Sequence, residues 1–145
     1  MVYCQYPYTD STLKKLTLNI DLSKCTNANN AFTQLRALEV IDGTPIDFSS
    51  ISNATNTGAF QQVPSLREVR FVANSIKYSI KFLQSDKLST DTIQSIIDGL
   101  ATVDTAQTVT LHANVKILQS QVDSANAKGW TVAGGTVVSE GEYYG

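Results

Sequence analysis

The sequence contains few of the side chains from which common active sites are built. His112 is its only histidine, and the two cysteines, Cys4 and Cys25, lie far from it. A nucleophilic triad needs a histidine beside its nucleophile, and a metal centre needs several ligands close together. The nucleotide-binding patterns G-x-x-x-x-G-K-[ST] and G-x-G-x-x-G are also absent. We therefore predict no enzyme activity, no metal site and no cofactor, and we interpret His112 as a surface residue of a strand.

Long apolar runs are missing as well. No run of about 18 apolar residues occurs, and Met1–Asp10 has neither a basic start nor an apolar stretch of signal-peptide length. The chain as given is expected to carry no export signal and no membrane span. It could still be exported within a longer polypeptide, or act in a virus particle, so the localisation stays open.

A strong charge of either sign is absent too. The 11 Lys and Arg nearly balance the 13 Asp and Glu, which gives a net charge of −2 and a pI near 5.2. Scattered basic residues cannot form the dense positive stripe that nucleic acid or an anionic membrane requires. We expect neither nucleic acid nor membrane insertion among the partners.

The chain is rich in small hydrogen-bonding residues, with Ser, Thr and Asn common throughout its 145 residues. These residues favour turns and exposed strand faces over helix interiors. At 42% hydrophobic, the length suits one core, so we predict a single domain over 1–145.

One apolar pattern recurs. Residues 66–76 fit L-x-x-L-x-L-x-x-N-x-L when Val, Phe and Ile count as Leu, with Asn74 at the Asn position. Its L-x-x-L-x-L core is found again at 13–18 and 35–40, and at 106–111 with Ala106 in the first position. Such recurrence is typical of leucine-rich-repeat proteins. We predict an α/β repeat fold, a leucine-rich-repeat-like solenoid whose short stacked strands form a curved sheet, with helices inserted near the C-terminal half.

The wider spacing of the later strand positions indicates these insertions. Ile76–Phe82 alternates apolar and polar residues, which predicts an additional strand. Ser89 is placed to cap a helix whose apolar positions run from Ile93 to Leu100 at helical spacing.

The end of the chain predicts a closing module. A second helix is expected over about 116–127, followed by a strand that buries Trp130. The repeats and this module would occupy 13–133. We interpret 1–12 as an N-terminal cap or a tail, and 134–145 as a last edge strand or a disordered tail.

A second correspondence links the first two units. Ile20–Ala28 aligns with Ile46–Ala54 without a gap, and Cys25 falls where the later segment has Ile51. We therefore predict that Cys25 is a buried, unreactive structural residue. Two cysteines without C-x-x-C spacing are too few for a disulfide framework.

Four segments in chain order resemble the BspA-like leucine-rich-repeat proteins of gut bacteria and their prophages: 13–32, 35–60, 66–74 and 88–100. The ending over 105–132 is similar to the C-terminal module of phage-associated members, so the resemblance covers roughly 11–133. It implies a curved solenoid used for adhesion or protein recognition, at a bacterial surface or in a phage particle, without catalysis. Asp21 and Gly43 depart from the Asn of the pattern in the first two units.

Strand alternation predicts one outward face, which we interpret as the candidate recognition face. Its residues are Lys15, Thr17, Asn19, Glu39, Ile41, Glu68, Arg70, Val72, Thr108, Thr110 and His112. Within it, we expect Glu39 and Arg70 to be neighbours in a row that begins at Thr17 and ends at Thr110. Ile41 and Val72 would form a small exposed apolar pair. The alternative is a solvated sheet face without a ligand.

The leading hypothesis is a non-enzymatic recognition or adhesion module with a protein or glycan ligand. The alternative is a structural subunit or spacer that binds only copies of itself, which would make it a homo-oligomer. An enzyme whose site no motif reveals is a third reading.

Overall fold

The computed structural model describes residues 12–33, 35–54 and 57–145. The elements in chain order are β1 (Lys15–Leu18), β2 (Val40–Gly43), the 3-10 helix η2 (Gly58–Phe60), β3 (Ile80–Phe82), α1 (Thr90–Gly99), β4 (Gln107–Leu111), β5 (Lys116–Leu118), α2 (Gln119–Ala127), β6 (Trp130–Ala133), β7 (Thr136–Val138) and α3 (Glu140–Tyr144). None of the described helices is long and apolar enough to cross a membrane.

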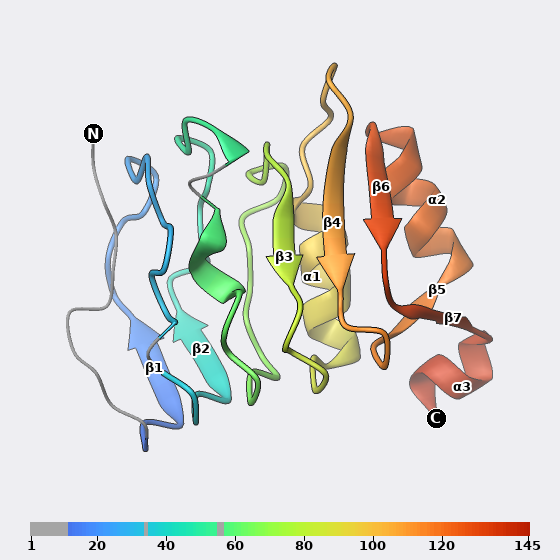
Figure 1. The fold of residues 1–145 in the computed structure, drawn as a ribbon, viewed down its shortest axis with the longest axis horizontal. Coiled ribbons are helices and arrows are strands. Elements are labelled where there is room, and N and C mark those ends of the chain that lie inside the picture. Colours follow the sequence, from blue (N-terminus) through green and yellow to red (C-terminus); the bar gives the residue numbers. More distant parts are fainter. Residues whose placement is uncertain (1–11, 34, 55–56) are drawn as a thin grey trace.

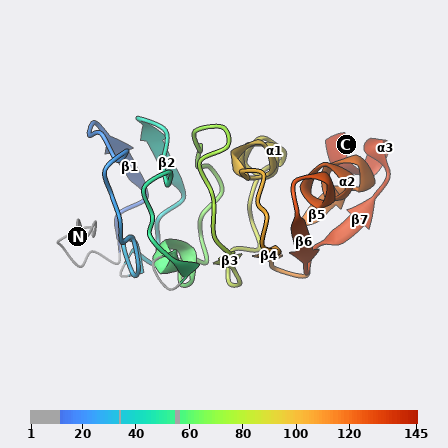
Figure 2. The same ribbon diagram turned by 90° about the horizontal axis from the view of Figure 1, so that it is seen from above.

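The elements lie in two layers (Figures 1 and 2). In the view of Figure 2, β1, β2, α1 and α2 lie in the upper layer, whereas β3, β4 and β6 lie in the lower layer. The chain passes repeatedly from one layer to the other, and the core is enclosed between them. The pair β1–β2 therefore lies in the upper layer, whereas β3, β4 and β6 form a sheet in the lower layer.

The strands belong to three separate small sheets, each entirely parallel. β1 pairs with β2, β4 pairs with both β3 and β6, and β5 pairs with β7. Single bridges such as Val40 to Glu68 and Ile46 to Phe71 extend the first sheet without forming a further strand.

The prediction of a leucine-rich-repeat-like solenoid is wrong. A continuous curved sheet is not formed by the described residues, and no repeat stacking is evident among them. The strand expected beside 69–71 is β4, yet β4 pairs in the other layer with β3 and β6. The place beside 67–71 is taken instead by α1, because Ser89, Thr92 and Ser95 bond to that segment.

The register of β2 also differs from the prediction. Leu16 is paired with Ile41, so Ile41 points into the core and is only 3% exposed, while Val40 is half-buried. The apolar spacing also fits a frame that starts at Leu38, three residues later than the frame that was predicted. In this frame Gly43 occupies the third apolar position of the L-x-x-L-x-L pattern. Because glycine does not match an apolar residue there, the pattern did not indicate this frame.

Gly43 is required by the backbone at the end of β2. Its φ is +84°, in the region that favours glycine, and a Cβ atom there would lie 2.1 Å from the carbonyl oxygen of Leu18. That oxygen accepts a hydrogen bond of 2.8 Å from the N–H of Thr44. The chain therefore turns close against β1 and then diverges from it.

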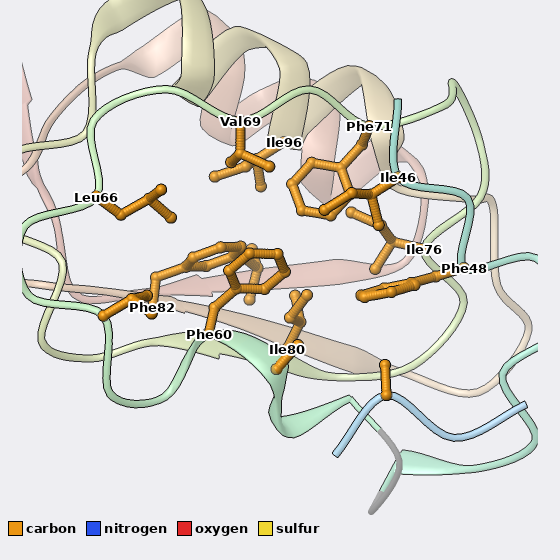
Figure 3. Close-up of a cluster of buried hydrophobic side chains, with 14 of the residues drawn as sticks. Ile46, Phe48, Phe60, Leu66, Val69, Phe71, Ile76, Ile80, Phe82 and Ile96 are labelled. Carbon is orange, nitrogen blue, oxygen red and sulfur yellow. The ribbon is translucent and has the colours of Figure 1, made fainter. Parts of the chain in front are cut away.

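The core between the layers is built around phenylalanine rings (Figure 3). The ring centroid of Phe60 lies 5.2 Å from that of Phe82 and 5.7 Å from that of Phe71, and Phe48 contacts the same group. These rings are buried with aliphatic side chains from both layers, including Ile96 of α1. Aromatic pairs at this spacing are favourable beyond their buried area.

Two predictions for the C-terminal half, the helix capped by Ser89 and the buried Trp130, agree with the structure. α1 begins after Ser89, whose hydroxyl accepts the N–H of Thr92, and it buries Ile93, Ile96 and Ile97. Trp130 is 2% exposed and donates from Nε1 to the carbonyl of Ala101 at 2.7 Å. The capped helix and the shielded tryptophan are confirmed.

The bounds of other predicted helices and strands differ from those in the structure. The second helix begins at Gln119, because 116–118 forms β5, and only the end of the predicted strand over 76–82 is a strand. The segment 134–145 contains both β7 and the short helix α3, and the helix was not predicted. The predicted N-terminal cap lies, apart from Thr12, outside the described residues.

The gapless correspondence of 20–28 with 46–54 has a structural counterpart. Ser23 donates its N–H to Asp21, and Ser49 donates to Asp47, each at 2.9 Å, so both segments begin with the same turn. Cys25 is buried, as predicted, with 2% of its surface exposed. It is not a free thiol, however, but is disulfide-bonded. The other cysteine of the sequence, Cys4, lies outside the described residues.

Candidate functional site

Charged side chains of alternating sign follow one another across the upper layer. Lys15 of β1 lies 3.2 Å from Asp42 of β2, and Glu39 lies 4.0 Å from Arg67. Beyond them, Arg70 reaches Glu68 at 3.4 Å and Asp91 of α1 at 3.8 Å. We call these residues the charged row: Lys15, Glu39, Asp42, Arg67, Glu68, Arg70 and Asp91.

Backbone hydrogen bonds hold the segments of the charged row side by side. The N–H of Glu39 donates to the carbonyl of Lys14 at 2.8 Å, and the N–H of Arg67 donates to the carbonyl of Glu39 at 2.8 Å. Lys15 is paired with Val40, and Val40 is bridged to Glu68. The charged row therefore stands on a fixed backbone while its side chains remain accessible to solvent.

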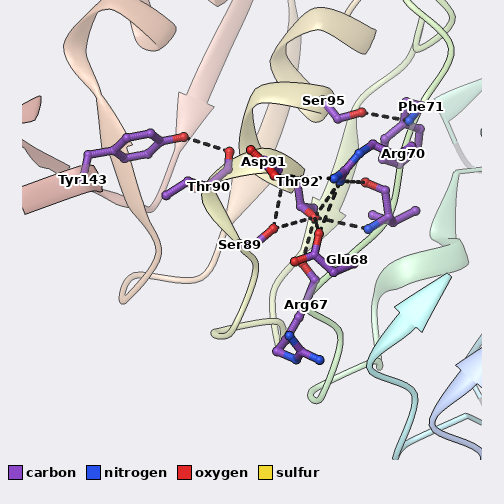
Figure 4. A network of polar contacts seen from close by, with 11 residues as sticks. Arg67, Glu68, Arg70, Phe71, Ser89, Thr90, Asp91, Thr92, Ser95 and Tyr143 are labelled. Atoms are coloured by element: carbon purple, nitrogen blue, oxygen red, sulfur yellow. Dashed lines mark hydrogen bonds and ion pairs between the residues drawn. The ribbon is translucent and has the colours of Figure 1, made fainter. Parts of the chain in front are cut away.

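Thr92 joins the middle of the charged row to α1 (Figure 4). Its hydroxyl donates to the carbonyl of Arg67 at 2.7 Å and accepts the N–H of Val69 at 3.2 Å. The hydroxyl is also 3.4 Å from Glu68 and 3.5 Å from Arg70. Because Thr92 is fully buried, it fixes 67–70 against the first turn of α1.

Ser95 and Tyr143 complete this attachment. The N–H of Phe71 donates to the hydroxyl of Ser95 at 2.9 Å, and the hydroxyl of Tyr143 donates to the carbonyl of Thr90 at 2.9 Å. Burial of the Tyr143 ring raises the pKa of its phenol. Tyr143 therefore remains a neutral donor at ordinary pH, and α3 supports the start of α1.

Two neighbours of Asp42, a residue of the charged row, act on the ionisation of its carboxyl group. The hydroxyl of Thr17 donates to its carboxylate at 2.6 Å, and Lys15 adds a second contact. Together, with Thr17 the larger cause, they lower the pKa of Asp42. The carboxylate therefore stays ionised at any physiological pH.

Exposed ion pairs of this kind do little for folding. Each typically contributes about 0–1 kcal/mol, because solvent screens the charges and the side chains lose freedom. Four successive pairs across three strand-like segments and a helix thus have little value as stabilising contacts. An ordered pattern of both signs is better suited to recognising a partner of complementary pattern.

Only some residues of the predicted recognition face lie together in the structure. Lys15, Thr17, Glu39, Glu68 and Arg70 lie together in or beside the charged row. The predicted row from Thr17 to Thr110 is not formed, since Thr17 pairs with Asp42 and Glu39 pairs with Arg67.

The remaining predicted residues lie elsewhere. Thr108 and Thr110 belong to β4 in the lower layer, and His112 follows them. Ile41 is buried, so the expected apolar pair with Val72, which is exposed, does not exist. Asn19 is exposed just after β1.

Three members of the charged row were missed: Asp42, Arg67 and Asp91. The corrected β2 frame would have placed Asp42 beside Thr17 and Arg67 level with Glu39. Asp91 could not be found from periodicity, because its position depends on α1 packing against 67–71.

His112 follows β4 and is not part of the charged row. His112 is half-buried, and its Nδ1 atom accepts the N–H of Asn114 at 3.0 Å, which is a turn contact. Within the described ranges, no group of three His, Cys, Asp or Glu side chains could hold a metal ion.

Comparisons of the chain with protein-family models, with curated proteins and with solved structures find no match.

Proposed function

We propose that the chain is a non-catalytic recognition module that binds a protein partner through the charged row. The observation that carries this proposal is the alternation of Lys15–Asp42, Glu39–Arg67 and Glu68–Arg70–Asp91 across one layer. The three positive and four negative groups give this surface nearly no net charge. Affinity must then come from matching a pattern of charges, which a folded protein surface can offer and a polyanion cannot.

Preorganisation supports the same proposal. Thr92 and the backbone bonds fix the segments beneath the charged row, so binding needs to order only the outer parts of the side chains. Interfaces that start from a fixed backbone lose less conformational entropy on association. Arg67 and Arg70 can also form paired hydrogen bonds to carboxylates of the partner.

The resemblance to BspA-like proteins adds a location to the proposal. On this basis the module acts at a bacterial surface or in a phage particle. The disulfide bond of Cys25 supports a site outside reducing cytosol, since disulfides persist mainly in oxidising compartments.

A binding screen tests the proposal. The purified chain would be applied to arrays of bacterial-surface and extracellular proteins, and the ligands found would be measured with wild type and Arg70→Glu. We expect Arg70→Glu to weaken binding about tenfold or more, and we expect the affinity to fall with salt, because the charge pattern is reversed at its centre. The fold should be unchanged, as judged by Trp130 fluorescence.

Lys81→Glu is the matched control. Lys81 is an exposed residue of β3 in the lower layer, so reversing its charge changes the net charge equally without touching the charged row. Equal effects of Arg70→Glu and Lys81→Glu on every ligand would refute the proposal.

A second candidate is a self-assembling structural subunit. Within the described chain, β6 is paired only on the side of β4, so its other edge is open. β7 and α3 lie near the same end of the molecule, and each carries an exposed apolar residue, Val137 in β7 and Tyr144 in α3. Open edges and apolar surface favour association of copies. Light scattering that finds a monomer at 100 µM or so would exclude this candidate.

A further inference from the structure

A small hollow lies where the chain enters α1, and none of the seven residues of the charged row lines it. Its walls come from 86–88 and Thr90, where the chain enters α1, and from 114–116, where it enters β5. The hollow encloses about 220 Å³. This is below the roughly 300–1,000 Å³ of pockets for drug-sized ligands, so the space suits a single ring with its substituents.

The walls of the hollow are held in place. Next to 86–88, the fully buried hydroxyl of Ser85 donates to the carbonyl of Val63 at 2.9 Å, and the N–H of Ser89 donates to the carbonyl of Arg67 at 3.0 Å. On the opposite side, the N–H of Thr136 donates to the carbonyl of Val115 at 2.7 Å. A ligand would therefore meet a preformed site.

The polar side chains that line the hollow have unused hydrogen-bonding capacity. In the part of the chain that the structure describes, the side chains of Asp86, Lys87, Thr90, Asn114 and Lys116 form no hydrogen bond or ion pair. They offer a carboxylate, two ammonium groups, a hydroxyl and an amide. This contrasts with the charged row, whose groups are already paired with one another.

We propose that this hollow binds one carboxylated sugar unit, such as a uronic acid at a chain end. Hydroxyl groups of a sugar need mixed donors and acceptors, which Asn114, Thr90 and Asp86 provide. The two lysines outnumber the one carboxylate, so an anionic sugar is favoured over a neutral one. Leu88, which is half-buried, gives an apolar wall for the C–H face of the ring, and the buried Val115 lies behind it. None of the described residues that line the hollow is aromatic, so the charge of the ligand must supply the selectivity.

The test is a titration of the isotope-labelled full chain with sodium glucuronate, followed by amide chemical shifts. We expect shifts confined to 86–90 and 114–116 at millimolar glucuronate. Lys87→Met and Lys116→Met should each weaken binding about two- to fivefold, the range expected for an exposed charge contact. Lys24→Met serves as the control and should bind glucuronate as wild type does, because Lys24 is an exposed lysine that does not line the hollow.

Glucose and sodium acetate are titrated in parallel. Equal shifts with acetate would mean an adventitious ion only, and equal shifts with glucose would mean no selectivity for the carboxylate. Either result, unchanged binding by both lysine variants, or no shifts at these residues would overturn the proposal. Arg70→Glu should leave glucuronate binding unchanged, so this site and the charged row fail or succeed independently.

Discussion

The hydroxyl of Ser75 is the one buried side-chain oxygen or nitrogen among the described residues that has no hydrogen-bond partner. It follows Asn74, which has a φ of +59°, and the residue is 2% exposed. A buried hydroxyl without a partner loses its hydration and gains nothing in return. Ser75→Ala should therefore raise the free energy of unfolding by about 1 kcal/mol, measured by urea denaturation.

Ser85 is the matched control for that substitution. It is fully buried and donates to Val63, so Ser85→Ala should lower the free energy of unfolding by about 1–3 kcal/mol. The two serines then differ in the sign of the effect. A loss of stability in both variants would show that the Ser75 hydroxyl does have a partner.

Asp42 provides a prediction about pH. Thr17→Val removes the hydrogen bond that contributes most to lowering the pKa of Asp42, so this pKa should rise towards the ordinary aspartate value of about 3.9. A depressed pKa in the folded state stabilises the fold above the ordinary value, and the contribution is lost as the pH falls through the folded value. The effect should thus be visible only below about pH 4.

Carboxyl chemical shifts measured against pH would give this pKa directly. Asp47→Asn serves as a control substitution, since Asp47 caps a separate turn and should leave the titration of Asp42 unchanged. An Asp42 midpoint that is the same in Thr17→Val and wild type would contradict the assigned hydrogen bond.

Among the elements, α1 determines where the middle of the charged row stands. Ser89 caps its N-terminus, so Ser89→Ala should lower the free energy of unfolding by about 1 kcal/mol and speed amide exchange in the first turn. Ser139 caps α3 with nearly the same backbone geometry, but α3 has five residues and lies at the chain end. Ser139→Ala should therefore lower the free energy of unfolding by less than Ser89→Ala does. A larger cost for Ser139→Ala would contradict this ranking.

The elements also show which features could be predicted from sequence. The capped helix over 90–99 and the closing strand at Trp130 were found because their signals are local: a capping serine, helical apolar spacing and a single large apolar residue. The frame of β2 was missed because two overlapping apolar spacings compete there. The position of β4 was missed because partner choice depends on α1 occupying the alternative place.

The candidate site was predicted in part for the same reason. Alternation around β1 and 68–70 correctly predicted that the side chains of Lys15, Glu68 and Arg70 reach the solvent. It could not predict which charge would stand beside which, because the change of frame in β2 replaces Arg70 by Arg67 as the neighbour of Glu39. Contacts between distant segments were inaccessible to a pattern that describes each strand alone.

For the molecule as a whole, the disulfide bond of Cys25 is expected to limit stability in reducing conditions. Cys25→Ala should lower the free energy of unfolding by about 2–4 kcal/mol, and reductant should have a similar effect on wild type. Guanidinium unfolding curves with and without reductant would measure both. Cys25→Ala itself should be insensitive to reductant, and identical wild-type curves in the two conditions would contradict a stabilising bond.

The parallel pairings all join segments that follow one another closely along the chain. The separation is 20 residues from Lys116 to Thr136 and 29 residues from Ile80 to Val109, and the other strand pairs lie between these limits. During synthesis, each strand can therefore find its partner once roughly two or three dozen more residues have left the ribosome, without waiting for the C-terminus. Because Trp130 closes the second half, a nascent chain that stalls before β6 would leave the edge of β4 open and invite association with its neighbours.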